Sequence, residues 1–459
     1  MPTSNLHGAL TGTSATRINP IEVAAPERVR AAQADLLTVQ LAYLQSRSVF
    51  YQRKLARAGV EWSSLRRIED LARVPFTVKQ ELRDSLAAAP PFGEHLAADP
   101  LDLAQMQASS GTTGSPAYVG LTAKDVLQWT EGSARSLHAC GIRHGDRVLH
   151  AFSLSKGFVG GVPMFQAIQH LGALDIPIGA DGGADRLLIA ARDHRPRVIV
   201  GTPNFVAHLG QIAQAKIGVA ANDLGVELLV VGGEPGGGIP ALRDQLQELW
   251  GARVTEMMGG TDFGVMYWAE CEHQRGMHMI SPDFVLAELI DPKSGEVQPF
   301  TPGSFGELVY TALGRQASPL LRFRSGDHVE VLDPGCPCGR TGPTIRCVGR
   351  TDDMLIVRGV NLFPSAVQEV VGELGPAISG VLRILADFPG HSTQSNLKVL
   401  VERGASADPS ADSRTKTELE SRIRNRLSVK AEVEMLPYEA FERPGARKIS
   451  LTIRERPVL

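Results

Sequence analysis

Apolar residues recur at helical spacing through the first part of the chain. This pattern covers residues 26–58, where we expect one or two helices, and residues 68–86, where we expect a shorter helical region. Residues 124–140 show it again, and Thr122 stands where an N-cap residue would begin that helix. The N-terminal part is therefore predicted to be largely helical.

From residue 147 onward, short apolar runs alternate with amphipathic stretches. The expected strands are residues 148–152, 173–178, 197–201, 227–231 and 253–257. The expected helices are 184–193, 204–215 and 239–250, and residues 157–171 are expected to form a Gly-rich turn that leads into a helix. Such alternation predicts a parallel sheet covered by helices. Ligands bind at the carboxyl ends of such strands, so the turns 231–236 and 257–262 are candidate walls of a site. Each turn on its own is equally consistent with an ordinary tight turn.

The pattern becomes β-rich after residue 277. The expected strands are residues 284–290, 306–311, 320–323 and 328–332, which indicates a barrel or an antiparallel sheet. From about residue 352 the helices 364–374 and 415–427 alternate with strand-like segments. We therefore predict an α/β protein with a large domain (1–351) of helix-covered sheets and a β-rich subdomain, followed by a small α+β domain (352–459).

Composition narrows the class of protein. With 459 residues, 43% hydrophobic and 21% charged, the chain is typical of a soluble globular protein of two or three domains. A net charge of −3 predicts neither a nucleic-acid nor a membrane partner. The polar residues 1–20 do not resemble a signal peptide. Five cysteines provide no disulfide framework, which favours a cytoplasmic protein, with a homodimer as one option for its assembly.

Residues 109–115 read Ser-Ser-Gly-Thr-Thr-Gly-Ser, without one apolar side chain. Glycines allow close backbone approach and hydroxyl groups add donors, so the run predicts a loop that wraps a polyphosphate. It is not a Walker loop, because no Gly-Lys-Ser/Thr closes it. A flexible surface loop is the alternative.

Four further motifs follow this loop in order. They are Gly-Gly-Glu-Pro-Gly (232–236), Met-Gly-Gly-Thr-Asp (258–262), Leu-Arg-Phe-Arg-Ser-Gly-Asp (321–327) and Val-Gly-Arg-Thr-Asp-Asp-Met-Leu (348–355). Together they resemble the adenylate-forming superfamily of acyl-CoA synthetases, adenylation domains and luciferases. The run 349–364 is similar to phenylacetate–CoA ligases. The resemblance covers nearly the whole chain after about residue 30.

The resemblance implies a two-step reaction. A carboxylate attacks the α-phosphate of ATP to give an acyl-adenylate and pyrophosphate, and the thiol of coenzyme A then displaces AMP. Mg²⁺ and hydrogen-bond donors would screen the two anionic reactants. The implied phosphate contacts are Ser109, Ser110, Gly111, Thr112, Thr113 and Gly114, with Thr261 at the α-phosphate. The implied nucleotide contacts are Gly233, Glu234, Pro235, Met258, Gly259 and Gly260, with Glu234, Pro235 and Met258 at adenine. Asp327 would accept hydrogen bonds from the ribose hydroxyl groups, and Arg350 would approach the phosphate or the ribose.

Two positions depart from the family. Asp262, the implied Mg²⁺ ligand, stands where the family usually has glutamate. Near the C-terminus the family has a Gly-Lys pair, whereas here Ala446 follows Gly445. Lys448 is therefore our candidate for the catalytic lysine of the adenylation step, with Arg447 as its rival. An exposed basic residue without a catalytic role is the alternative.

The resemblance also assigns a hinge. Asp352 matches the position about which the small C-terminal domain rotates between the two half-reactions, so this domain is expected to be mobile. The second pose would bring residues 358–361 near coenzyme A.

Cysteine spacing suggests a second metal. Cys336 and Cys338 form a C-x-C turn, and Cys271 and His278 lie upstream, with His273 as the alternative to His278. Thiolates and imidazoles suit tetrahedral Zn²⁺, and four protein ligands would make the site structural. Some relatives that look similar here carry a structural zinc. Reduced turn cysteines without metal are the alternative.

By resemblance, residues 153–161 line the pocket for the acid, including Ser155 and Phe158. Gly232, Gly233, Met257 and Gly259 would line it too. Relatives that take phenylacetate carry more aromatic residues near Leu154, so we expect a compact pocket. It could take a benzoate- or phenylacetate-like acid or a small branched or hydroxylated aliphatic acid, and Ser155 could bond a polar substituent. For Phe158, ordinary core packing is the alternative.

Three activities fit these observations. An AMP-forming acid–CoA ligase leads, an enzyme that loads a carrier-protein thiol is second, and a non-catalytic nucleotide-binding regulator is third. Pyrophosphate release that depends on an added acid would exclude the third.

Overall fold

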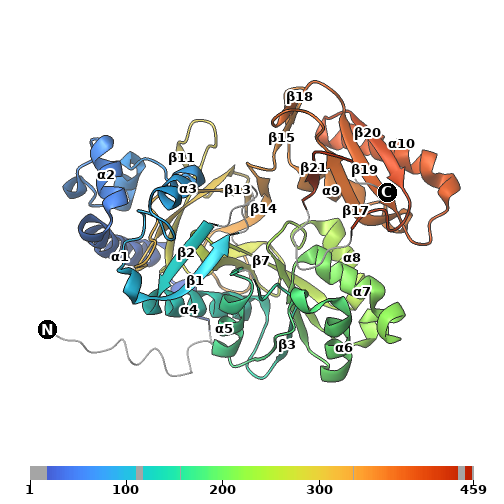
Figure 1. Ribbon diagram of the computed structural model, residues 1–459, viewed down its shortest axis with the longest axis horizontal. Coiled ribbons are helices and arrows are strands. Elements are labelled where there is room, and N and C mark those ends of the chain that lie inside the picture. The colour runs from blue at the N-terminus through green and yellow to red at the C-terminus, as the bar shows by residue number, and fades with distance from the viewer. Residues whose placement is uncertain (1–17, 110–116, 156, 334, 443–449, 457–459) are drawn as a thin grey trace.

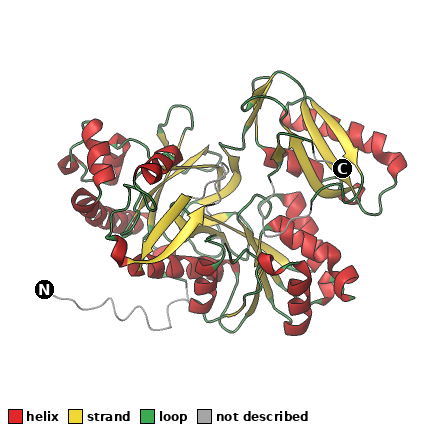
Figure 2. Ribbon diagram, in the orientation of Figure 1, coloured by secondary structure: helices red, strands yellow, loops and turns green. Residues whose placement is uncertain are grey.

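The computed structural model describes residues 18–109, 117–155, 157–333, 335–442 and 450–456. A large body of helices and strands occupies most of the molecule, and a smaller group of elements lies at the upper right of Figure 1. Figure 2 shows helices on the outside of a long curved sheet. The α/β fold class predicted from the sequence is confirmed.

The N-terminal helices pack on the antiparallel half of that sheet. Helices α1 (Pro26–Arg47), α2 (Val49–Arg57) and α3 (Lys79–Ala88) form a group at the left of Figure 1. Leu41, Leu44 and Leu55 are buried in one hydrophobic cluster with Leu286 and Leu313 from the β-rich part. The expected helices at 26–58 and in the second half of 68–86 are therefore found, whereas residues Ile68–Arg73 form a 3₁₀-helix.

Twelve strands form one continuous sheet in the order β11-β10-β12-β13-β14-β9-β8-β7-β6-β5-β3-β4. The parallel half contains β3 (Arg147–His150), β4 (Leu174–Ile176), β5 (Val198–Gly201), β6 (Leu228–Gly232) and β7 (Arg253–Gly260). Its helices are α4 (Ala123–Cys140), α5 (Val162–His170), α6 (Ala184–His194), α7 (Pro203–Ile217) and α8 (Pro240–Trp250). Two clusters of buried apolar residues cover the two faces of this half. The predicted alternation of strands and helices is thus present, and Thr122 caps α4 as expected.

The antiparallel half joins the parallel half at β7. It contains β8 (Gly264–Glu270), β9 (Met277–Met279), β10 (Val285–Ile290), β11 (Val297–Gln298), β12 (Phe305–Ala312), β13 (Phe323–Leu332) and β14 (Thr344–Arg350). A separate hairpin of β1 (Leu103–Ser109) and β2 (Ala117–Thr122) flanks the Ser/Thr/Gly run.

Two expectations about strands and turns were wrong. The segment 257–262 is not a turn throughout, because β7 continues to Gly260 and pairs with the unpredicted strand β8. A Cβ built on Gly259 would lie 1.5 Å from the carbonyl oxygen of Val265, so this glycine serves close strand approach instead of a turn. The expected strands 320–323 and 328–332 are likewise one strand, β13, with irregular pairing to β12 around Gly326 (φ 78°).

The elements after residue 355 build two small sheets of their own. They are β15 (Leu355–Val357), β16 (Val360–Leu362), α9 (Pro364–Gly372), β17 (Ile378–Leu385), β18 (Ser392–Thr393), β19 (Leu397–Arg403), α10 (Asp412–Leu427), β20 (Ala431–Leu436) and β21 (Thr452–Ile453). One hydrophobic cluster joins both sheets and both helices. The Gln245 side chain of α8 donates a 2.8 Å hydrogen bond to the carbonyl oxygen of Gly372, which links this group to the large body.

Among the described residues, no helix is both long and apolar enough to span a membrane.

Candidate functional site

The carboxyl ends of the parallel strands bring together the residues expected to bind the acid. Gly232 at the end of β6 pairs with Met257 of β7. A Cβ built on Gly233 would lie 3.7 Å from Thr202 Cγ2, 3.8 Å from Phe152 Cε1 and 4.0 Å from Phe158 Cζ. The rings of Phe152 and Phe158 have centroids 6.1 Å apart. The structure therefore places Phe158 against the glycines at this edge of the sheet.

Asp181 holds the loop that carries Ser155. Its Oδ2 accepts hydrogen bonds from Ser153 Oγ (2.8 Å), Leu154 N (2.8 Å) and Ser155 N (3.0 Å). Burial acts to raise the pKa of Asp181, but these donors hold the pKa below its usual value. Asp181 follows β4 at the same sheet edge. Sequence reasoning missed this residue, because it belongs to none of the motifs and its partner Ser155 is 26 residues away in the chain.

Asp327 and Arg350 are cross-strand partners in β13 and β14. Arg350 Nη1 lies 2.5 Å from Asp327 Oδ1, and Arg350 Nε lies 2.9 Å from Asp352 Oδ1. Burial raises the pKa of Asp327 above its usual range, although Arg350 and Ser325 act to lower it. Arg350 therefore links Asp327 to Asp352, the predicted hinge residue.

A separate ion pair joins Lys79 to Asp262. Lys79 Nζ lies 3.3 Å from Asp262 Oδ2, and 12% of the Asp262 side chain is exposed. Burial acts to raise the pKa of Asp352, but the charges of Arg350 and Lys79 keep it below its usual value. Lys79 thus forms an ion pair with Asp262, and its charge also acts on Asp352 from another motif.

Lys79 was missed at the level of the sequence. It is the first residue of α3, where the helix dipole disfavours a positive charge. A lysine in the first turn of an expected helix was the only available signal, and its partner Asp262 is 183 residues away in the chain.

The remaining predicted nucleotide contacts lie near these groups along the chain. Thr261 is buried in the connection between β7 and β8, and Met258, Gly259 and Gly260 belong to β7. Glu234 and Pro235 follow β6, and Glu234 accepts a 3.2 Å hydrogen bond from the backbone N–H of Asn204. Ser109 is the last residue of β1. Ser110, Gly111, Thr112, Thr113, Gly114, Arg447 and Lys448 lie outside the described residues.

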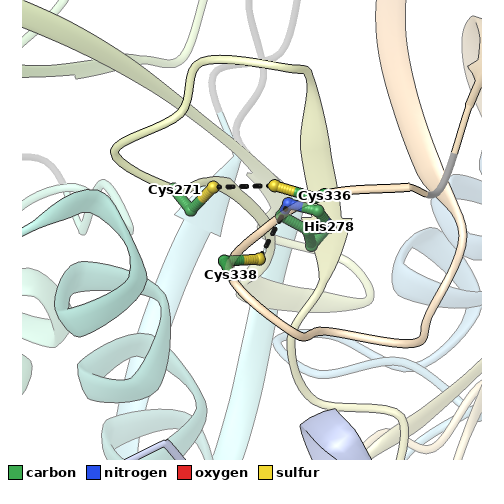
Figure 3. Close-up of side chains that lie close together, drawn as sticks. All are labelled: Cys271, His278, Cys336 and Cys338. Carbon is green, nitrogen blue, oxygen red and sulfur yellow. Dashed lines mark hydrogen bonds between the residues drawn. The ribbon is translucent and has the colours of Figure 1, made fainter.

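Cys271, His278, Cys336 and Cys338 form a compact cluster on the antiparallel half of the sheet (Figure 3). Their ligand atoms all lie within 4.8 Å of one another. Cys271 Sγ lies 3.5 Å from Cys336 Sγ, far beyond a disulfide bond, and Cys338 Sγ lies 3.6 Å from His278 Nε2. Four soft donors at this spacing fit a tetrahedral ion.

The surroundings of the cluster orient its ligands. Thr344 Oγ1 lies 3.2 Å from His278 Nδ1, which leaves Nε2 directed at the cluster. The neighbouring Arg340 forms a buried ion pair of 2.7 Å with Glu22, near the N-terminal end of the described chain. The alternative ligand His273 does not belong to the cluster.

Two family models match the chain. One, described as AMP-binding enzyme, matches residues 28–314, and a second, described as AMP-binding enzyme C-terminal domain, matches residues 359–455. Among curated proteins, a phenylacetate-coenzyme A ligase from Thermus thermophilus is 37% identical over 83% of both chains. Another from Aromatoleum evansii is 31% identical and covers 96% of this chain and 97% of its own.

A solved structure of a 2-hydroxyisobutyryl-CoA ligase in the postadenylation state superposes with a TM-score of 0.88 at 28% identity. It covers 95% of this chain and 92% of its own. The same ligase in its thioesterification state gives a TM-score of 0.70, at 30% identity and with 95% and 91% coverage. The parts of the present structure are therefore arranged more as in the postadenylation state.

Proposed function

The chain belongs to the AMP-binding enzyme family, and from this we propose that it is an AMP-forming carboxylic acid–CoA ligase that activates an aryl acid. Its curated relatives are phenylacetate-coenzyme A ligases that match most of its length. ATP and coenzyme A are its co-substrates. The observation that carries the proposal is a pair of charge clusters built from the adenylation motifs: Arg350 pairs with both Asp327 and Asp352, and Asp262 pairs with Lys79.

In the first half-reaction, a carboxylate oxygen of the acid attacks the α-phosphorus of ATP. The bond from that phosphorus to the bridging oxygen breaks, and pyrophosphate leaves with the electron pair. In this proposal the Ser/Thr/Gly loop and Thr261 hold the phosphates, and Asp327 accepts hydrogen bonds from the ribose. Lys448 adds positive charge at the reacting phosphate. The coenzyme A sulfur then attacks the acyl carbon, loses its proton, and AMP leaves.

Asp262 fits the magnesium ion that the family implies. Its carboxylate is mostly enclosed, and carboxylate and phosphate oxygens are the ligands that Mg²⁺ prefers. When bound, the ion would neutralise charge on the phosphates. Lys79, which pairs with Asp262 in this structure, would lie close enough to contact the phosphates as well.

An acid panel tests the function. We expect pyrophosphate release when ATP and an aryl acid are both present, and an acyl-CoA product when coenzyme A is added. No release with any acid would contradict the proposal. Release followed by acyl transfer to a carrier-protein thiol, but not to coenzyme A, would identify a carrier-loading enzyme instead.

A small 2-hydroxy aliphatic acid is the second candidate substrate. Two observations favour it: the similarity to a 2-hydroxyisobutyryl-CoA ligase, and the polar group formed by Ser153, Ser155 and Asp181 at the acid edge. The same panel separates the two, because kcat/KM for 2-hydroxyisobutyrate would then exceed that for benzoate and phenylacetate.

We also propose that residues 352–459 rotate about Asp352 relative to residues 1–351. The difference between the TM-scores for the postadenylation and thioesterification states, 0.88 and 0.70, supports this, since one ligase adopts two arrangements. If the domain did not rotate, a C-terminal side chain needed for adenylation would stay at the reacting centre during both half-reactions. Removing that side chain would then slow both adenylation and thioester formation.

We further propose that Cys271, His278, Cys336 and Cys338 bind one structural Zn²⁺ ion. All four positions are occupied by protein ligands, so no site is left for a substrate. The cluster joins the end of β8, strand β9 and the loop before β14, and Arg340 beside it anchors the N-terminal segment through Glu22. The free thiols are consistent with the cytoplasmic setting that we propose.

Cys336→Ser should remove the zinc and lower the melting temperature by roughly 5 °C, which corresponds to about 2 kcal/mol in a domain of this size. Cys347→Ser is the matched control, because Cys347 lies outside the cluster. Metal analysis should find one zinc per chain in the natural protein and in the control. A zinc content much below one ion per chain in protein purified without chelators would contradict the proposed zinc site.

A further inference from the structure

A small cavity lies directly behind the Asp262 side chain. Residues of α3 and β2 line it together with Asp262, and α3 packs beside β2 (Figure 1). The cavity offers about 10 Å³ to the centre of a water molecule, which is about the room that one bound water needs. Most of its wall is apolar, but His95, Ser318 and Asp262 also line it. None of the adenylation motifs contains His95 or Ser318.

The His95 ring is fixed on the side away from the cavity. Its Nδ1 lies 2.8 Å from Ser85 Oγ, and its backbone N–H donates to the same oxygen at 3.1 Å. A Cβ built on Gly93 would lie 2.6 Å from Nδ1, so the ring also packs against the backbone. Ser85 Oγ accepts the backbone N–H of His95, and we assign the hydroxyl proton of Ser85 to the bond with Nδ1. The proton of a neutral imidazole then resides on Nε2.

The environment keeps this imidazole neutral. His95 is 3% exposed, and burial lowers its pKa to about 4, although the Asp262 charge acts to raise it. A neutral ring with its proton on Nε2 is a donor, and Asp262 needs donors on the side of its carboxylate that faces away from a metal.

Ser318 supplies the third polar group. Its side chain is 3% exposed, and its Oγ has no hydrogen-bond partner among the described residues. A buried hydroxyl group without a hydrogen-bond partner is destabilising, so a partner inside the cavity is favoured. A water molecule there would have three polar neighbours, which is the usual number for buried water.

We propose that His95 is a positioning residue for Asp262, acting through one water molecule held between His95 Nε2, Ser318 Oγ and the Asp262 carboxylate. Lys79 contacts this carboxylate, and Arg315 donates to its main-chain carbonyl at 2.9 Å. With the water-mediated bond, the carboxylate would be held in one orientation before Mg·ATP arrives. This inference rests on the proposed role of Asp262 as the magnesium ligand.

His95→Leu is the test, with Leu82→Met as the matched control, since Leu82 lines the same cavity without a polar group. We expect His95→Leu to raise the magnesium concentration for half-maximal ATP binding about tenfold, as outer-shell changes at metal sites do. Its ligand-free melting temperature should fall only slightly, because leucine suits an apolar wall but the buried Ser85 hydroxyl group loses its partner Nδ1. His95→Gln, which keeps an N–H donor, should recover much of the loss. Calorimetric titration and thermal melting of the full chain measure these effects.

Three results would overturn the inference. One is an unchanged magnesium requirement in His95→Leu, and another is an equal change in Leu82→Met. The third is a high-resolution crystal structure without water, or with an adventitious cation, between His95 and Asp262. Asp262→Ala distinguishes failure of the proposed magnesium ligand from failure of the proposed positioning residue. If this variant leaves the magnesium requirement unchanged, the proposed role of Asp262 fails. If it abolishes magnesium-dependent binding while His95→Leu has no effect, only the role of His95 fails.

Discussion

Asp262→Ala should lower acid-dependent pyrophosphate release about 1,000-fold, equivalent to about 4 kcal/mol of transition-state stabilisation. The reason is electrostatic: without this carboxylate, no described side chain of the Met-Gly-Gly-Thr-Asp motif holds a cation beside the phosphates. The variant would also leave the Lys79 ammonium without its partner in this structure. Initial rates across a magnesium titration measure the loss.

Two further variants give this prediction its controls. Asp262→Glu keeps a carboxylate and should retain activity within about tenfold of the natural protein, since one methylene changes position but not ligand type. Asp244→Ala removes an exposed carboxylate of α8 and should leave the rate unchanged. If Asp262→Ala releases pyrophosphate at a rate within about tenfold of the natural protein, the metal is held elsewhere. Loss of a catalytic metal ligand should cost more than that, because the ion contributes several kcal/mol to catalysis.

Lys448→Ala should slow adenylation about 100-fold, the effect of removing one group that stabilises developing charge. Thioester formation from a supplied acyl-adenylate should change by less than about threefold, because the rotated C-terminal domain would carry Lys448 away from the reacting centre. Pyrophosphate release and single-turnover acyl-CoA formation measure the two half-reactions separately.

Arg447→Ala is the matched control for Lys448→Ala. The two residues are adjacent, and the missing Gly-Lys pair leaves both as candidates. A large adenylation defect in Arg447→Ala alone would transfer the role to Arg447. An equal loss in both half-reactions of Lys448→Ala would contradict both the lysine's role and the rotation about Asp352.

The parallel half of the fold could be predicted because its strands are short, mostly apolar runs that alternate with amphipathic helices. β5 and β6 are examples, with every residue buried. The junction between the two halves could not be predicted, because the conformation of its residues depends on the pairing of β7 with β8. Gly259 and Gly260 have the composition of a turn, yet they belong to a strand whose close partner, β8, makes the glycine necessary.

The candidate site shows the same division. Motif residues such as Asp327 and Arg350 could be named from order and spacing, and they proved to be cross-strand partners. Lys79, Asp181 and His95 could not be named, because each acts on a residue far away in the chain and none belongs to a local pattern. The Cys/His cluster was an intermediate case: the C-x-C turn indicated Cys336 and Cys338 as a pair, but only the folded sheet brings Cys271 and His278 close to them.

The most direct test of the central claim is exchange of labelled pyrophosphate into ATP without coenzyme A. If the protein forms an acyl-adenylate, exchange requires its acid and Mg²⁺, needs no thiol, and is lost in Asp262→Ala. If no aryl or 2-hydroxy acid supports exchange while acyl-CoA still forms, the acid is not activated through an adenylate, and the proposed reaction is wrong.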